Sequence, residues 1–96
     1  MRIYYPPTSN PEEFQARYLE GHLPLVQKYA NIKETRFEKA ARTIMGEFPY
    51  AYVFSGTWED KEGWKADMNS PEAADATEDA KQFAPEFTVV TFERLA

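Results

Sequence analysis

The positions of the seven prolines constrain the fold of this 96-residue chain more than any other feature. Proline has no backbone N–H and a fixed φ angle, so it ends strands and starts helices but rarely lies inside either. Pro6 and Pro7 end a short β-prone run, Arg2–Tyr5, which we expect to form the first strand. Most of the other prolines fall where patterns of different period meet, so the chain is expected to alternate between strands and helices.

A helix is predicted over Pro11–Tyr29, because Asn10 supplies an N-cap and proline is favoured at the first helical position. Its apolar stripe repeats every three or four residues and consists of Phe14, Tyr18, His22, Leu25, Val26 and Tyr29. Gly21 and Pro24 interrupt this stripe, and the ring of Pro24 would crowd the preceding turn of a regular α-helix. We therefore expect a kink or break within residues 20–24.

Two strands are predicted in the middle of the chain. Ile32–Thr43 alternates loosely, which is typical of an irregular or edge strand, and Gly46 and Pro49 mark a turn after it. Tyr50–Glu59 is the clearest strand, with a period-two pattern in which both sides are fairly apolar. A strand of this kind predicts a sheet that is covered on both faces.

The remaining elements complete a recognisable order. Asp60 and Ser70 are each expected to cap a helix, Pro85 ends the second of these helices, and Phe87–Leu95 is the last predicted strand. The order β-α-β-β-α-β, with the second helical region split, is that of the ferredoxin-like fold, an antiparallel sheet with helices on one face. We predict a single α+β domain over residues 1–96.

The predicted sheet has helices on only one of its two apolar faces, so the other face needs a cover. A chain of this size also buries only about 60–65 % of its unfolded surface, which favours self-association. Aromatic residues make up 16 % of the chain, a share that suits an interface or an apolar pocket. The expected partner is a second copy, packed sheet against sheet as a homodimer in a dimeric α+β barrel.

Composition excludes several classes of function. The net charge of −5, with no cluster of Lys and Arg, argues against nucleic-acid binding. No stretch approaches the about 20 apolar residues that cross a bilayer, and no signal peptide is visible, so we expect a cytoplasmic protein without membrane contact. One His and no Cys leave only carboxylates as metal ligands, and the acidic positions around Glu72 to Asp79 lack the glycine and spacing of an EF-hand, so no metal site is expected. Without a phosphate-binding glycine loop or a dinucleotide motif, no cofactor is expected.

The segment Tyr18-Leu19-Glu20-Gly21-His22-Leu23-Pro24-Leu25-Val26 resembles the Tyr-x-x-x-His-x-Pro-Leu signature of the EthD family, named for a gene in ethyl tert-butyl ether degradation. Three further runs extend the resemblance over nearly the whole chain: Tyr5-Pro6, Trp58-Glu59-Asp60 and Phe83-Ala84-Pro85-Glu86-Phe87-Thr88. The resemblance implies a dimeric α+β barrel without an obligatory cofactor. Related barrels include small monooxygenases, muconolactone isomerases and polyketide cyclases, so it also implies a ligand between the helices and the sheet of each subunit.

His22 is the only histidine, and it lies on the apolar stripe beside the predicted break. A break frees backbone groups that can orient an imidazole while its second nitrogen faces a cavity, which suits a general acid or base near neutral pH. Tyr18, one turn earlier on the same face, is the second candidate catalytic residue. The alternative is a structural His22 that bonds a freed carbonyl and fixes the kink.

Four aromatic residues are candidate substrate-binding side chains, because their rings suit a flat or apolar ligand: Tyr5, Tyr52, Phe54 and Phe87. Plain core packing is the alternative for any one of them. Arg36 is a further candidate, since it is the cation of the second strand that can pair with a ligand carboxylate. The alternative for Arg36 is an exposed pair with Glu34 or Glu38.

Three functions follow as hypotheses. The first is a cofactor-independent enzyme of the oxidoreductase, isomerase or lyase type, which acts on a small apolar or aromatic carbonyl or lactone metabolite in catabolism, with His22 as acid or base. The second is a non-catalytic ligand-binding accessory protein of a degradation pathway. The third, and the least favoured, is a haem-binding barrel protein with His22 as the iron ligand.

Overall fold

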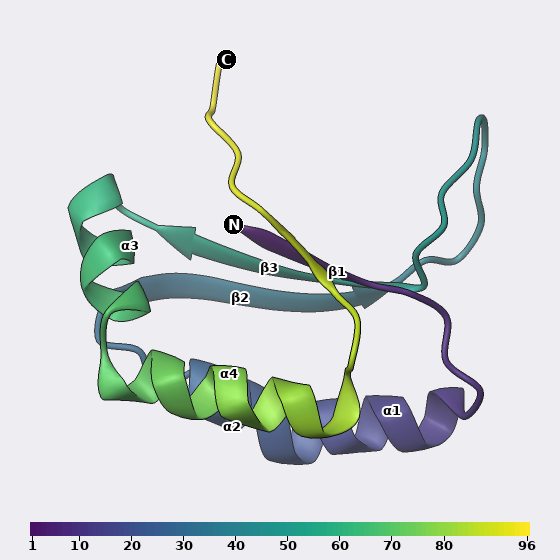
Figure 1. The fold of residues 1–96 in the computed structure, drawn as a ribbon. Coiled ribbons are helices and arrows are strands. Elements are labelled where there is room, and N and C mark those ends of the chain that lie inside the picture. The colour runs from purple at the N-terminus through teal and green to yellow at the C-terminus, as the bar shows by residue number, and fades with distance from the viewer.

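The computed structural model describes residues 1–96, and its elements follow the predicted order (Figure 1). They are β1 (Arg2–Tyr5), α1 (Pro11–Arg17), a π-helical turn (Tyr18–His22), α2 (Leu23–Val26), β2 (Ile32–Lys39), β3 (Tyr52–Trp58), α3 (Lys61–Met68), α4 (Pro71–Phe83) and β4 (Thr88–Val90). The three expected caps are in place, because the side chains of Asn10, Asp60 and Ser70 each accept a backbone hydrogen bond at the start of their helix.

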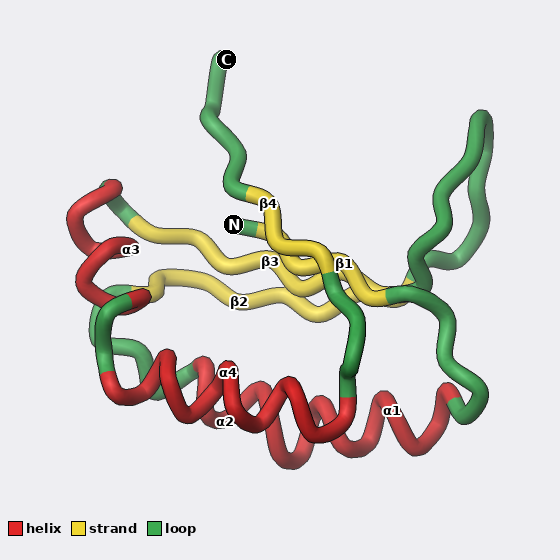
Figure 2. The backbone as a smooth tube through the Cα atoms, in the orientation of Figure 1, coloured by secondary structure: helices red, strands yellow, loops and turns green.

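The four strands form one antiparallel sheet in the order β2-β3-β1-β4. Figure 2 shows α1, α2 and α4 in one layer along the same face of this sheet. This is the predicted α+β ferredoxin-like arrangement, and β2 lies at an edge as expected. No helix is both long and apolar enough to span a membrane.

Three strands are shorter than the sequence predicts, and the smallest difference is that of β3, which covers Tyr52–Trp58 and not Tyr50–Glu59. β2 stops at Lys39 and not at Thr43, because Lys39 pairs with Tyr52, the first residue of β3. β4 stops at Val90, well before its predicted end, because Val90 pairs with Arg2, the first residue of β1. A strand ends where its neighbour no longer offers residues to pair with, and this end cannot be predicted from the residue pattern of one strand alone.

The predicted kink in the first helix is the π-helical turn, which we call the π turn. Leu23 donates its backbone N–H to the carbonyl of Tyr18, five residues earlier and not four. Pro24 has no N–H to donate, and its ring would crowd a regular turn, so the widened turn accommodates it. The helix then ends at Val26, before its predicted end, in a tighter turn with i→i+3 bonds.

The core lies between the helices and the inner face of the sheet, and aromatic rings dominate it. Its buried members are Tyr5, Phe14, Tyr18, Val26, Tyr52, Phe54, Ala76 and Ala84. Several of the rings stack, and the closest pair is Tyr18 on Phe37, with 3.8 Å between centroids and 6° between planes. Contacts of this kind add about 0.5–1.5 kcal/mol each beyond the burial of apolar area.

The opposite face of the sheet, which we call the open face, is largely polar. Its side chains include Arg2, Glu34, Arg36, Glu38, Ser55 and Thr57, with Tyr4 and Val53 as the apolar members. The expectation of two apolar faces is therefore wrong for the open face. β3 alone is fairly apolar on both sides, but the alternation of β1 and β2 places charged residues beside it.

A buried carboxylate joins three parts of the fold. Asp67 of α3 is 1 % exposed and accepts a hydrogen bond from Trp58 Nε1 at 2.7 Å. It also accepts from the backbone N–H of Asn31 at 3.1 Å and from Asn31 Nδ2 at 3.0 Å. Because these donors come from the end of β3 and the loop before β2, Asp67 fixes α3 against the sheet.

Asp67→Ala is expected to lower the free energy of unfolding by about 3 kcal/mol, because it leaves partly buried donors of Trp58 and Asn31 without an acceptor. Urea unfolding followed by circular dichroism measures this change. Lys65→Ala, an exposed substitution on the same helix, is the matched control and should change stability by less than about 0.5 kcal/mol. Equal stability of the two variants would contradict the role given to Asp67.

Candidate functional site

Tyr18 and His22 lie at the two ends of the π turn, and both side chains point into the core. Tyr18 is 0 % exposed and His22 is 3 % exposed. Their rings are 4.9 Å apart between centroids. Because the Tyr18 ring also stacks on Phe37 of β2, the π turn holds both candidate catalytic residues against the inner face of the sheet.

Asp79 of α4 connects two side chains of the first helical region. Its Oδ2 lies 3.0 Å from His22 Nδ1. The Arg17 guanidinium donates to both carboxylate oxygens, at 2.5 Å to Oδ1 and 3.2 Å to Oδ2. Gly21 makes room for this, since a Cβ at that position would collide with Arg17 Nη1. We call the array Arg17–Asp79–His22 the Asp79 bridge.

Burial sets the protonation state of His22, and the Asp79 bridge sets which ring nitrogen carries the proton. Burial lowers the pKa of His22 below its ordinary value, and this effect outweighs the opposing attraction of Asp79. The hydrogen bond from Arg17 lowers the pKa of Asp79. At neutral pH the carboxylate is charged and the imidazole is neutral. Since a carboxylate only accepts hydrogen bonds, the imidazole proton lies on Nδ1, and Nε2 keeps a lone pair that suits a base.

The pKa values of two buried tyrosines, Tyr5 and Tyr18, are raised, whereas that of His22 is lowered. Burial raises the pKa of Tyr5 to about 12, and it raises the pKa of Tyr18 still further. The Tyr5 hydroxyl donates to the Tyr18 hydroxyl across 3.4 Å, a long and weak bond. Both phenols therefore stay protonated and act as hydrogen-bond donors. Because the two pKa values shift in opposite directions, His22 can act as a base while Tyr18 acts as a hydrogen-bond donor.

A cleft of about 220 Å³ opens beside these side chains, between the loop after β1 and the end of α4. We call it the aromatic cleft, because Tyr5, Phe14 and Phe83 line it. Its volume lies below the about 300–1,000 Å³ of common ligand pockets. His22 does not line the cleft. Phe83 does line it, and the Phe83 ring lies 5.3 Å from the His22 ring between centroids.

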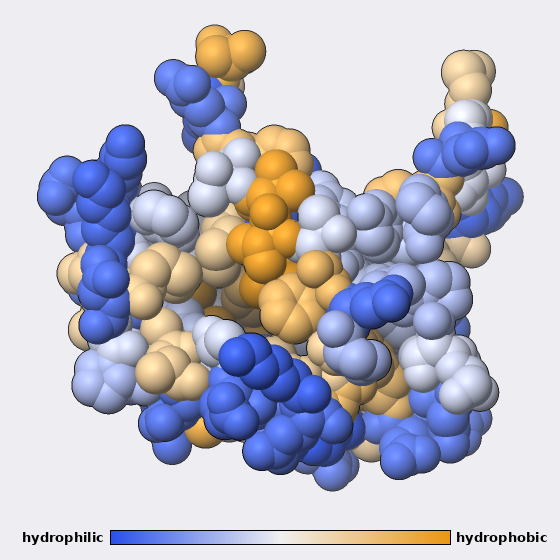
Figure 3. All heavy atoms as spheres, in the orientation of Figure 1, coloured by the Kyte–Doolittle hydropathy of each residue, from blue (hydrophilic) through white to orange (hydrophobic).

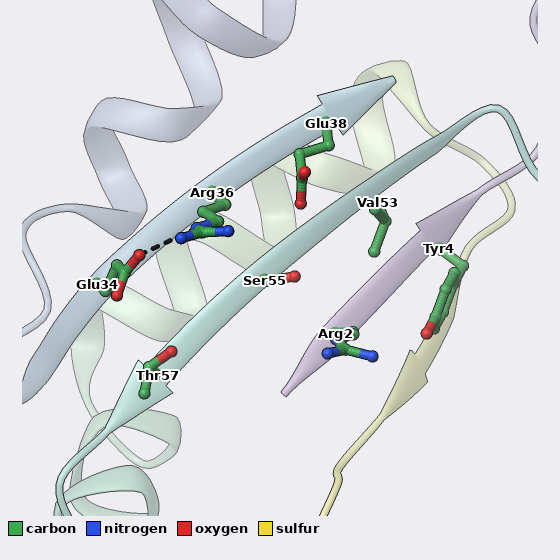
Figure 4. A pocket seen from close by; sticks show the side chains of 8 residues that line it. All are labelled: Arg2, Tyr4, Glu34, Arg36, Glu38, Val53, Ser55 and Thr57. Carbon is green, nitrogen blue, oxygen red and sulfur yellow. Dashed lines mark hydrogen bonds and ion pairs between the residues drawn. The ribbon is translucent and has the colours of Figure 1, made fainter. Parts of the chain in front are cut away.

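A second hollow, of about 420 Å³, lies on the open face (Figure 4). Figure 4 shows Arg36 and Glu38 on β2 and Arg2 on β1, with the smaller side chains of β3 between them. Arg36 Nε donates to Glu34 at 3.0 Å, and 65 % of the Arg36 side chain is exposed. This hollow holds neither candidate catalytic residue, so the helix side of the sheet is the better candidate site.

The structure brings most of the predicted site residues together and separates one from them. The buried cluster contains Tyr5, Tyr18, His22, Tyr52 and Phe54, none of them more than 3 % exposed. Phe87 is half-buried, with its ring 6.0 Å from Tyr5, and it is not on the wall of the aromatic cleft. Arg36 lies on the open face in the ion pair with Glu34 that we gave as its alternative role.

Arg17 and Asp79 are candidate site residues that the sequence patterns did not predict. Asp79 comes from another helix, 57 residues after His22, and no local pattern links two such positions. A signal was nevertheless present. Asp79 precedes Phe83 by one helical turn and is adjacent to Ala80, so it lies on the flank of the apolar stripe of α4. An acid in that position favours a partner on the neighbouring helix, and Arg17 and His22 are the two such partners in the structure.

Comparison with known proteins identifies relatives of this chain. The family model of the EthD domain matches residues 6–86. No curated protein matches the chain. Among solved structures, an ethyl tert-butyl ether degradation (EthD) family protein from Bacillus halodurans C-125 is similar with a TM-score of 0.88 and 21 % identity. That match covers 98 % of this chain and 95 % of the other.

Two further solved structures share the fold. A protein of Arabidopsis thaliana has a TM-score of 0.80 and 15 % identity, over 99 % of this chain and 93 % of the other. HapK from Hahella chejuensis has a TM-score of 0.64 and 14 % identity, over 99 % and 96 %. The TM-scores show a common fold, and at identities this low the similarity does not indicate a common function.

The burial of neutral His22 predicts a pH dependence of stability. Its pKa in the folded state lies below the unfolded value of about 6.5, so the unfolded chain binds the proton more tightly. Stability is then fully present above pH of about 6.5 and falls as the pH drops toward the folded pKa. Asp79, whose pKa is lowered, contributes stability that is lost only as the pH falls below about 3.9.

Melting temperatures of the wild type and of His22→Gln, measured from about pH 7 to about pH 5, separate the histidine from all other groups. The wild type should lose more stability over this range than the variant, because His22 is the only histidine. Parallel curves for the two proteins would contradict a buried, neutral imidazole.

Proposed function

The chain belongs to the EthD family, and we propose that it binds a small apolar or aromatic carbonyl or lactone compound and moves a proton on it without a cofactor. The observation that carries this proposal is the Asp79 bridge, which holds the proton of the buried, neutral His22 on Nδ1 and leaves a lone pair on Nε2 beside protonated phenols. A base and a donor in one site are what proton abstraction next to a carbonyl requires. The reaction would be of the oxidoreductase, isomerase or lyase type, in cytoplasmic catabolism.

The proposed chemistry begins when His22 Nε2 takes a proton from the carbon next to the carbonyl. The electrons of that C–H bond move toward the carbonyl oxygen, and the Tyr18 hydroxyl donates a hydrogen bond to the enolate that forms. Asp79 stabilises the imidazolium through Nδ1–H, while Arg17 keeps Asp79 charged and oriented. Return of the proton to a different carbon completes an isomerisation.

A non-catalytic ligand-binding protein is the second candidate function, and the burial of His22 is the observation that favours it. The imidazole is 3 % exposed, and Glu86 is the one carboxylate that lines the aromatic cleft. An apolar ligand can bind there without any reaction. Haem fits poorly, because His22 is 3 % exposed and does not line the cleft of about 220 Å³.

We also propose a homodimer in which the open faces of two sheets meet. In Figure 1 the loop between β2 and β3 and the C-terminal residues extend away from the helices. Exposed apolar side chains lie on these two segments: Ile44, Met45, Phe48, Phe92 and Leu95. Figure 3 shows apolar surface gathered over β4, above the hydrophilic surface of α4. A second copy would cover these side chains, and the mixed charges of the open face can pair across the interface.

Light scattering should give a mass twice the 11.1 kDa of one chain at micromolar concentration, for an interface of roughly 1,600 Å² or more. Val53→Asp places a carboxylate on the open face next to Glu38 and should yield a folded monomer. Leu19→Asp, an exposed apolar position of the π turn, is the matched control and should stay dimeric. A wild-type protein that is monomeric would remove this part of the proposal.

Proton abstraction can be measured before the natural substrate is known. Incorporation of deuterium next to the carbonyl of acetophenone, phenylacetone or γ-butyrolactone in D₂O is followed by NMR. His22→Gln should lower the protein-catalysed rate by about 10² or more. Tyr18→Phe should lower it less, because the ring stays in place and one hydrogen bond is lost.

Lys81→Ala, on the exposed side of α4, is the control for this measurement and should keep the wild-type rate. Two results would count against catalysis: a wild-type rate no faster than buffer for every compound, or equal rates for the wild type and His22→Gln. If one of the compounds nevertheless binds, the second candidate function gains support.

A further inference from the structure

Phe83 is the aromatic residue that both lines the aromatic cleft and touches the imidazole of His22. Its ring lies 5.3 Å from the His22 ring and 6.0 Å from the Tyr18 ring, edge to face in both pairs. On the side of the cleft it packs against Phe14 at 5.6 Å. The other rings of the cleft wall, Tyr5 and Phe14, pack against Tyr18. A ligand in the cleft is therefore separated from His22 by the Phe83 ring.

The place of Phe83 in the chain makes this barrier movable. It is the last residue of α4, and the chain leaves the helix at Ala84 and Pro85. Helix ends open locally at a lower free-energy cost than the middle of a helix or the core. The Phe83 side chain is also half-buried, whereas Tyr18 and His22 are sealed. The hydrogen bonds among Arg17, Asp79 and His22 do not involve Phe83, so a turn of its ring toward solvent breaks none of them.

Arg17 covers another side of the same ring. Its guanidinium carbon lies 4.8 Å from the Phe83 centroid, which is a cation–π contact, while its nitrogens are held on Asp79. When the Phe83 ring turns away, the guanidinium loses this contact. A second aromatic ring restores it, and an aliphatic group of the same size does not.

We propose that Phe83 is the specificity-determining residue of the site: its ring gives way to an aromatic ring of the ligand, which then lies against Arg17 and within reach of His22. Of the apolar and aromatic carbonyl compounds proposed above, we therefore expect small aryl carbonyl compounds to be the ligands. This inference rests on the proposed function for the role of His22. The barrier that Phe83 forms is independent of any reaction, so it can be tested separately.

Modification of His22 by diethyl pyrocarbonate, counted by mass spectrometry, measures how open the imidazole is. The reagent attacks neutral imidazole, and the chain has a single histidine. Phe83→Ala should raise the modification rate at least about tenfold, because the ring no longer has to open first. Phe83→Leu, which keeps an apolar contact and protects the fold, should raise it by a smaller factor.

Lys81→Ala is the matched control, since it changes an exposed residue of the same helix that does not line the aromatic cleft. Its modification rate should equal that of the wild type. All rates are compared below the melting temperature of each variant, so that global unfolding does not contribute.

The preference for an aromatic ligand is tested on the wild type with two ketones of similar size. Acetophenone should shift the ring-proton NMR signals of His22 and slow its modification, whereas cyclohexyl methyl ketone should do neither. The inference is overturned by an unchanged modification rate in both Phe83 variants, or by equal responses to the two ketones. If the Phe83 variants open His22 but no compound exchanges deuterium, the barrier stands and the catalytic role of His22 fails.

Discussion

Pro24 offers no amide hydrogen to the turn that precedes it, and the helix responds by widening into the π turn. The side chains that matter most lie on that turn or next to it. Its glycine, Gly21, leaves space for Arg17 to fold back toward α4. Arg17 in turn holds the carboxylate that orients His22. The geometry of the candidate site is thus a consequence of one missing hydrogen-bond donor.

The two faces of the sheet differ in composition and in surroundings. The inner face packs tyrosine and phenylalanine rings against one another, and their polar ends find partners inside the protein, as when Tyr52 accepts a hydrogen bond from Gln15. The open face keeps charged residues of both signs in contact with solvent. A small chain in which 13 residues are buried gains its stability mainly from the inner face. The open face is left available for association.

Local rules explain why so much of the fold could be predicted from the sequence. Caps such as Asn10 and Ser70, prolines and alternation act over a few residues, so they place the elements without knowledge of the rest. Strand ends depend on neighbours, which is why β4 stops at Val90. The burial of His22 followed from its stripe, but its partner Asp79 did not, because a contact across 57 residues is set by the docking of two helices. The polarity of the open face was missed because the prediction relied on β3 alone.

The hydrogen bonds of Asp67 also bear on how the sequence can change over time. Asn31 and Trp58 both donate hydrogen bonds to Asp67, so the effects of replacing the three residues do not add. Replacing Asp67 leaves both donors without their acceptor, and replacing either donor removes a hydrogen bond from the buried carboxylate. Selection therefore acts on them as one inherited unit, and related chains should keep the trio intact or exchange it as a whole. Such positions record ancestry better than the exposed residues around them do.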